Sequence, residues 1–170
     1  WNRPYGLTSL DNEPVVHINF NEAENYCKWN KKRIPTLKEW ELAAYTEFRP
    51  NNRDGYKFKK SYPYPTGENT LGLNCLNDCN FYYPSKYSKF LLRGYGHVST
   101  TSTKKGINGL YDMGGNVWEW VDINDNSYKG TKGGSWWYGK NQMIQGYNAT
   151  KPKNMSAVYI GFRCVKDFKN

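Results

Sequence analysis

One short stretch constrains the fold of this chain more than any other, the run Asn108-Gly-Leu-Tyr-Asp-Met-Gly-Gly-Asn-Val-Trp-Glu-Trp120. Gly114 and Gly115 permit backbone angles that residues with side chains avoid, so we expect a tight turn there. Trp118 and Trp120 follow the turn, and each has a large apolar surface whose burial is favourable. One interpretation of the run is therefore a structural turn that leads into two core tryptophans.

A second interpretation of the same run is a cation site. Asp112 and Glu119 supply a carboxylate on either side of the turn, and the carbonyl groups of Gly115 and Val117 can point inward between them. Two carboxylates with several carbonyl oxygens form a ligand set that suits calcium. The spacing predicts that these four residues bind one Ca²⁺ ion. The alternative is a salt bridge between Glu119 and an arginine, with no ion.

The composition is that of one domain with an aromatic core. The chain has 170 residues, of which 17% are aromatic and 38% hydrophobic overall. This length is sufficient to bury a core, which we expect to consist of large rings rather than aliphatic layers. No apolar run approaches the roughly 18 residues of a membrane-spanning helix, so no transmembrane segment is expected.

The chain is basic, with a net charge of +9 from 24 basic and 15 acidic residues. Such a charge attracts acidic partners, including nucleic acid, anionic glycans and membrane surfaces. The basic residues are scattered, however, and no stretch has the interleaved aromatic and basic residues of RNA-binding motifs. We therefore expect no nucleic-acid partner and assign the charge to solvated loops.

A first helix is expected after residues 14–20, whose alternating pattern predicts a short strand. Asn21 and Glu24 have the spacing of a capping box, in which each side chain bonds to the backbone of the other residue. The helix is predicted to end near Asn30. Helical spacing places three residues on its buried side: Ala23, Tyr26 and Cys27.

A second helix begins soon afterwards, because Thr36 and Glu39 repeat the capping-box spacing. It is predicted to end near Phe48, with Leu37, Trp40 and Ala44 on one face. Residues 49–107 lack periodicity and predict a long loop region that packs through its aromatic residues. Short strands are predicted at residues 117–121, 132–137 and 159–166.

The four cysteines, an even count, permit three disulfide connectivities. The alternative to disulfides is that the cysteines are reduced and buried as free thiols. A zinc site at Cys75 and Cys79 would need two more ligands, for which only His17 and His97 are present, so we do not expect one.

The run at 108–120 resembles a signature of the formylglycine-generating-enzyme family, also called the sulfatase-modifying-factor family. Other segments match that family in the same order, and these are Pro14–Trp29, Lys32–Ala44, Lys132–Trp136 and Ile160–Val165. The resemblance implies an α+β, C-type-lectin-like sulfatase-modifying-factor fold with little regular secondary structure, two helices and short antiparallel strands. It also implies a single domain over residues 1–170 that lacks the N-terminal portion usual in the family.

The resemblance implies a pairing for the cysteines. In the family, the cysteines at the positions of Cys27 and Cys164 pair with each other, and we favour Cys75 with Cys79 as the second bridge. Structural disulfides are typical of oxidising compartments, so we expect a secreted, periplasmic or cell-surface protein.

The resemblance also bears on metals. It supports the calcium site in the run at 108–120. A second calcium site of the family would use an asparagine such as Asn74 or Asn77 and an acidic segment, and Arg93-Gly-Tyr95 stands where the acid is expected. We expect this second site to be absent, because a cation repels calcium.

Oxidases of the family hold copper with two cysteines that follow the Gly133-Gly-Ser135 segment. The corresponding positions here are Tyr138 and Met143, neither of which supplies the thiolate that suits Cu(I). We therefore expect neither copper nor iron as a cofactor, and no catalytic residue is assigned. Ser135 is expected to bond to the backbone of a Gly-Gly turn rather than to act as a nucleophile.

Arg33 and Arg163 also lie in segments that match the family. We expect them to form ion pairs with Glu39, Glu41 or Glu119 rather than to bind an anion, because isolated charges are rarely buried.

Two functions follow from these observations. The favoured one is a non-catalytic scaffold or binding module, stabilised by disulfides and calcium, in a secretion, gliding-motility or cell-surface assembly. The alternative is a metal-dependent oxidoreductase with an altered active site. For a protein or glycan partner, we predict a binding surface at Trp137, Tyr138, Lys140, Asn141 and Met143. Core filling by Trp136, Trp137 and Tyr138 is the other interpretation of these rings.

Overall fold

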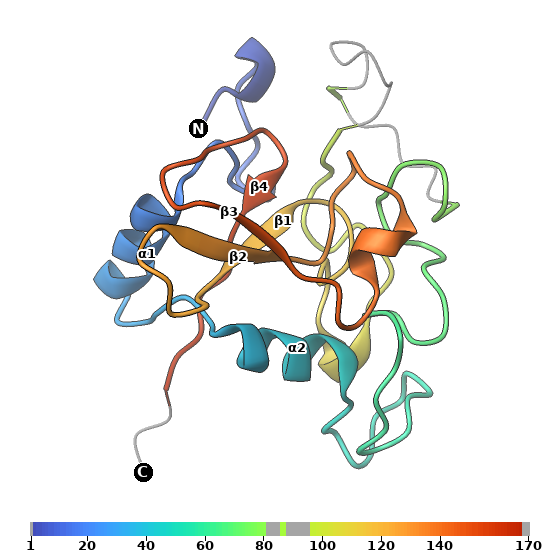
Figure 1. Ribbon diagram of the computed structural model, residues 1–170. Helices are drawn as coiled ribbons and strands as arrows, with labels where there is room; N and C mark the ends of the chain where they lie inside the picture. The colour runs from blue at the N-terminus through green and yellow to red at the C-terminus, as the bar shows by residue number, and fades with distance from the viewer. Residues whose placement is uncertain (1, 81–85, 88–95, 168–170) are drawn as a thin grey trace.

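A computed structural model describes residues 2–80, 86–87 and 96–167. The elements of this part of the chain are α1 (Phe20–Trp29), α2 (Leu37–Tyr45), β1 (Trp118–Val121), β2 (Tyr128–Lys132), β3 (Ala149–Pro152), β4 (Ile160–Gly161) and the short 3-10 helices η1 (Pro4–Gly6), η3 (Ile107–Gly109) and η4 (Lys140–Met143). In Figure 1, α1 lies at one end of the sheet and α2 runs beneath it.

The sheet has the strand order β3-β2-β1-β4. β1 pairs antiparallel with β2, which pairs antiparallel with β3, whereas β1 and β4 are parallel. The α+β class with two helices is thereby confirmed, and the parallel pair is the one departure from the antiparallel strands that were expected.

Two strand predictions were wrong. Residues 14–20 form no strand, and the prediction for residues 132–137 fails because β2 ends at Lys132. Gly133 and Gly134 adopt φ values of +90° and +71°, which turn the chain out of the sheet. β3 was not predicted.

Both helices begin with capping boxes, as expected, but the first box lies two residues earlier than predicted. Asn19 Oδ1 accepts from the Glu22 amide at 3.0 Å, and Glu22 Oε2 accepts from the Asn19 amide at 2.9 Å. This placement buries Phe20, while Tyr26 is exposed rather than part of the buried side. α2 has the predicted Thr36 cap and ends at Tyr45, three residues before the predicted position.

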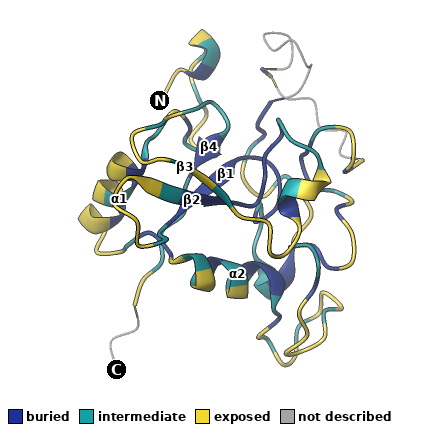
Figure 2. Ribbon diagram, viewed as in Figure 1, coloured by how far each residue is buried: buried dark blue, intermediate teal, exposed yellow. Residues whose placement is uncertain are grey.

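The core is divided by β1, which is buried on both faces (Figure 2). Trp118 and Trp120 pack with the buried side of α1, including Ala23 and Cys27. Val121 packs on the opposite face with Trp40 of α2. The two tryptophans of the run at 108–120 are therefore core residues.

Residues 49–107 form the expected loop region, in which η3 begins at Ile107 and no strand or α-helix occurs among the described residues. Phe81, Tyr82 and Tyr83, which were expected to pack there, lie outside the described residues. Among the helices that are described, none combines the length and apolar character needed to cross a membrane.

Candidate functional site

The segment after β2 is shaped by its two glycines. A Cβ atom at Gly133 would lie 2.6 Å from the Met113 carbonyl oxygen, so only glycine fits this close approach. Ser135 is fully buried, and its Oγ accepts from the Trp137 amide at 3.3 Å. This contact is the backbone-bonding role expected of the serine.

Tyr138 and Met143, at the positions of the family's copper ligands, differ in how far they are buried. Met143 is fully buried and packs with Leu73 and the Cys75–Cys79 bridge, so its assignment to a binding surface was wrong. Tyr138 is half-buried, and its ring lies 5.6 Å from that of Trp118. Met143 is buried by loop residues that are distant in sequence. Its polar sequence neighbours gave no sign of this burial.

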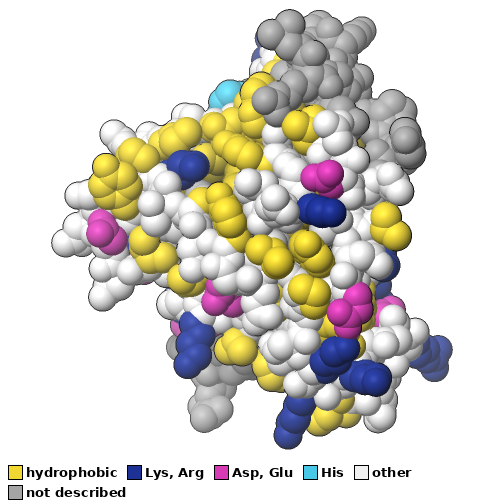
Figure 3. Space-filling view, turned by 45° about the vertical axis from the view of Figure 1, so that its right-hand side comes forward, with side chains coloured by type: hydrophobic (Ala, Val, Ile, Leu, Met, Phe, Trp, Pro, Cys, Tyr) yellow, Lys and Arg dark blue, Asp and Glu magenta, His cyan; other side chains and the backbone are white. Residues whose placement is uncertain are grey.

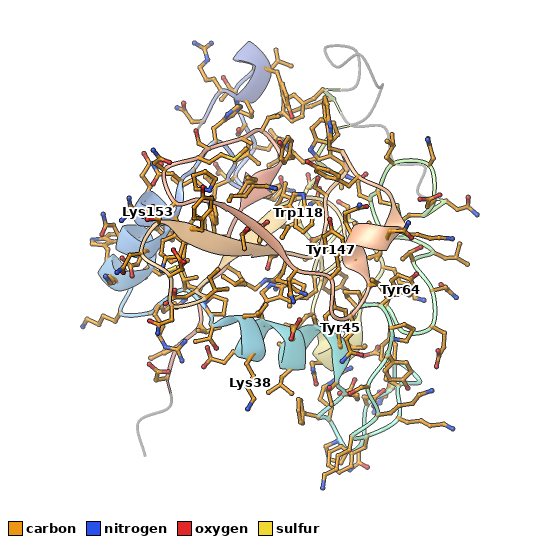
Figure 4. The ribbon with its side chains drawn as sticks, viewed as in Figure 1. Lys38, Tyr45, Tyr64, Trp118, Tyr147 and Lys153 are labelled. Atoms are coloured by element: carbon orange, nitrogen blue, oxygen red, sulfur yellow. A yellow bond between two sulfur atoms is a disulfide. The ribbon has the colours of Figure 1, made fainter. Side chains whose placement is uncertain are left out.

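Half-buried and exposed rings continue from Tyr138 across one face of the molecule. The Tyr159 ring lies 5.7 Å from Tyr138 and 6.0 Å from Trp137, and the Tyr147 ring lies 6.2 Å from Trp118. We call Trp137, Tyr138, Tyr147 and Tyr159 the aromatic face. Figure 3 shows hydrophobic side chains gathered across this side of the molecule, and Figure 4 shows Tyr147 beside Trp118.

The surroundings of the aromatic face are polar. Lys140 and Asn141 are exposed, as predicted, and the Lys140 amide donates to Asp78 at 3.1 Å. Trp118 Nε1 is buried among these rings and has no hydrogen-bond partner in the described part of the protein. Trp136 is fully buried and belongs to the core. Sequence reasoning missed Tyr159, which the fold brings beside Tyr138, and Tyr147, which it brings beside Trp118.

Glu119, on the far side of β1 from Trp118, is surrounded by protein donors. Arg163 donates to its two carboxylate oxygens at 2.6 and 2.5 Å. Trp40 Nε1 donates to the same carboxylate at 2.7 Å. This is the glutamate–arginine salt bridge expected as the alternative to an ion. Arg33 likewise pairs with Glu39, at 2.6 Å.

Asp112 interacts electrostatically with both Arg163 and Glu119. Its carboxylate accepts from the Thr101 amide at 2.9 Å and from the Thr103 hydroxyl at 2.7 Å. Burial nevertheless raises the pKa of Asp112, because the charged form is poorly solvated. A cation bound beside Asp112 would relieve that cost, but Arg163 already supplies positive charge to Glu119.

These residues therefore fit calcium only in part. Two carboxylates of the predicted set are near each other, and no group of three or more His, Cys, Asp or Glu side chains suited to a metal occurs among the described residues. If Ca²⁺ binds, Asp112, Glu119 and the carbonyls of Gly115 and Val117 would hold it. The ion would have a structural role, because its charge would stabilise the carboxylates. The calcium site stays a prediction.

Arg93-Gly-Tyr95, the segment named for the second calcium site of the family, lies outside the described residues. Asn74 is buried, and its side-chain amide donates to the Gly96 carbonyl at 3.0 Å and to Asn116 at 3.3 Å. In this arrangement Asn74 ties protein segments to one another.

Both disulfides are present with the expected pairing. Cys27–Cys164 joins α1 to the segment after β4, and Cys75–Cys79 closes a short loop. No free cysteine remains, so neither reduced thiols nor a zinc site at Cys75 and Cys79 is possible in this state. The bridges fit an oxidising, extracellular or secreted compartment.

Comparison with known proteins agrees with this architecture. Residues 1–168 match the family described as "Sulfatase-modifying factor enzyme 1-like domain". The chain is 36% identical to the inactive C-alpha-formylglycine-generating enzyme 2 of Bos taurus over 80% of its length, and 30% identical to the formylglycine-generating enzyme of Thermomonospora curvata over 98%. It spans 44% and 61% of those two proteins, respectively.

Solved structures share the fold at low sequence identity. The crystal structure of CarF has a TM-score of 0.65 at 18% identity, covering 93% of this chain and 69% of CarF. PvdO from Pseudomonas aeruginosa has a TM-score of 0.63 at 19% identity, covering 92% of this chain and 63% of PvdO. The family match over nearly the whole chain decides the classification: this chain belongs to the family of sulfatase-modifying factor enzyme 1-like domains.

Proposed function

We propose that this domain is a non-catalytic binding module, stabilised by its disulfides and one calcium ion, in a secretion, gliding-motility or cell-surface assembly. The proposal rests on the residues that occupy the two copper-ligand positions of the family. Tyr138 places a phenol ring there, and Met143 is buried against the Cys75–Cys79 bridge. Since all four cysteines are in disulfides, no thiolate is available for Cu(I).

The relatives give further support. Similar proteins from Bos taurus and Mus musculus are named as inactive formylglycine-generating enzymes, with 36% and 32% identity. Active enzymes are also among the relatives, for instance that of Thermomonospora curvata. Family membership alone therefore does not decide activity, and the residues at positions 138 and 143 favour the non-catalytic role.

The aromatic face is the proposed contact surface for a protein or glycan partner. Trp137, Tyr138 and Tyr159 are half-buried, and Tyr147 is 37% exposed, so the rings present apolar area without leaving the fold. Tyrosine and tryptophan supply large contact area at low entropic cost.

A binding screen with matched variants tests the surface. We expect defined glycans or displayed peptides to bind the wild type, and Trp137→Ala and Tyr138→Ala to abolish this binding. Tyr128→Ala is the control, because Tyr128 is 51% exposed on β2 and lies outside the aromatic face. Unchanged binding in both variants, with several kcal/mol lost from stability as for truncated core aromatics, would show that these rings serve only the core.

A metal and turnover assay tests the alternative oxidoreductase. The protein is incubated with Cu(I) or Fe(II), dialysed, and assayed for bound metal and for oxygen consumption with a cysteine-containing peptide. We expect substoichiometric metal and no turnover. One tightly bound copper or iron per chain, together with turnover, would overturn the proposal.

A further inference from the structure

Three aromatic side chains cluster at the C-terminal end of α1, away from the aromatic face. Trp29 is 78% exposed and Tyr26 is 52% exposed. The Tyr26 ring lies 5.9 Å from that of Trp29 and 5.6 Å from that of Phe162. Figure 2 shows the exposed outer side of α1. α1 packs on the core through Ala23 and Cys27, and Phe162 packs against the same core. Core packing therefore accounts for Phe162 but not for the exposed rings of Tyr26 and Trp29.

Two cations lie next to this cluster without a partner of opposite charge. Lys31 and Lys32 follow Asn30, the C-cap of α1. Both are exposed and form no salt bridge within the described part of the chain. The neighbouring basic residues are neutralised, since Lys28 pairs with Glu24 at 2.9 Å and Arg33 with Glu39. We call Tyr26, Trp29, Phe162, Lys31 and Lys32 the α1 surface.

The backbone conformation of Lys31 makes it possible to test the side chain for binding without disturbing the fold. Lys31 has φ of +54°, and the Lys32 amide donates to the Cys27 carbonyl at 2.8 Å, so α1 ends in a left-handed residue. Glycine is the residue that such helix ends favour. The helix end therefore does not require a lysine, and replacing it by glycine removes the charge without harming the fold.

The area and the charge of the α1 surface limit the kind of partner that it can bind. A stable protein interface buries about 800 Å² on each side, whereas each aromatic side chain supplies about 150–250 Å². Two copies meeting through this surface would bring their lysines together. Exposed tryptophan and tyrosine beside lysine are instead suited to the interface of a bilayer with anionic headgroups.

We propose that the α1 surface docks this domain on an anionic membrane surface. The indole of Trp29 enters the headgroup layer with Tyr26 beside it, and Lys31 and Lys32 contact anionic headgroups. This contact is peripheral, involves no membrane-spanning segment, and is independent of partner binding at the aromatic face.

Vesicle co-sedimentation tests the docking. We expect the wild type to bind vesicles of equimolar phosphatidylcholine and phosphatidylglycerol, to bind phosphatidylcholine vesicles far less, and to dissociate as salt is raised. Lys31→Gly should lower the partition coefficient about fivefold, the effect of one lysine near such a surface, with Tm unchanged or raised. Trp29→Ala should lower it at least as much, with Tm unchanged because the indole is exposed.

The chain offers a matched control. Phe58 is 46% exposed, and the adjacent Lys59 also has a left-handed backbone, with φ of +60°. Lys59→Gly repeats the lysine-to-glycine change elsewhere, and Phe58→Ala likewise removes an exposed aromatic ring, so both variants should leave binding nearly intact. Equal losses in the control pair would overturn the proposal, as would equal binding to both vesicle types. So would binding that prefers soluble heparin and depends on Trp29, since the surface would then recognise a glycan.

Discussion

Two parts of this domain are stabilised by different chemistry. In the helix–sheet part, residues 19–48 and 117–167, backbone groups pair in helices and strands around Trp118 and Trp120. In the loop part, residues 49–116, side chains often take that role, as where the Asn108 amide donates to the Ala43 and Thr46 carbonyls at 2.9 and 2.7 Å. The first part should respond mainly to lost volume and cross-links, and the second to pH and ligands.

The largest expected effect is the loss of the long-range disulfide in the helix–sheet part. Cys27 and Cys164 are 137 positions apart, and Cys75 and Cys79 are four apart. In the chain-entropy model, replacing the first pair by alanine lowers the free energy of unfolding by about 5 kcal/mol, and replacing the second pair lowers it by about 2 kcal/mol. Denaturant unfolding measures both. Equal losses would contradict the entropic account.

The next effect concerns acid stability of the loop part. Burial lowers the pKa of His97 to about 4, and its Nε2 lies 3.7 Å from a Glu13 oxygen. Because this pKa is depressed in the folded state, the unfolded chain binds more protons, so stability falls as pH drops from about 6.5 towards 4. The loss amounts to about 3 kcal/mol.

His97→Phe should flatten this part of the pH–stability curve, measured by urea unfolding. His17→Gln is the control, because the exposed His17 should affect the curve less. An unchanged slope in His97→Phe would mean that other groups cause the acid sensitivity.

The helices were predictable because capping boxes are local signals, whereas register and burial depended on distant contacts. Asn19 with Glu22 and Asn21 with Glu24 are overlapping boxes with the same spacing, and burial of Phe20 selects the first. β3 contains Pro152, which local propensity excludes from strands but which the edge of a sheet tolerates. The pairing of Glu119 with Arg163 was one of the expected alternatives, but its geometry required the fold.

The predicted calcium site would lie where the two parts meet, since Asp112 belongs to the loop part and Glu119 to β1. At free calcium ten times its dissociation constant, binding to the folded state alone adds about 1.4 kcal/mol to the free energy of unfolding. Asp112→Asn should lose this gain, and Thr46→Val should keep it, because the Thr46 hydroxyl bonds to Ser61 rather than to either carboxylate. Thermal melts with and without calcium measure the difference. A full calcium response in Asp112→Asn would exclude the site.

The smallest expected effect tests whether the helix–sheet part also depends on pH. Hydrogen bonding to Arg33 lowers the pKa of Glu39 to about 2. A carboxyl whose pKa is depressed on folding contributes stability above its unfolded value of 4.5 and loses it as pH falls towards 2. Arg33 and Glu39 are exposed by 36% and 41%, so solvent screening limits the contribution to about 1 kcal/mol or less.

Arg33→Gln should therefore reduce stability slightly at neutral pH, less so at pH 2 or in high salt. Lys28→Gln removes the more exposed pair with Glu24, at 60% and 36% exposure, and is the matched control with a still smaller effect. Urea unfolding of both variants across this pH range is the measurement. A loss in Arg33→Gln that exceeds 2 kcal/mol in any salt, on the order of a buried charge left unpaired, would show that Arg33 acts through burial. The helix–sheet part would then share the charge dependence assigned here to the loop part.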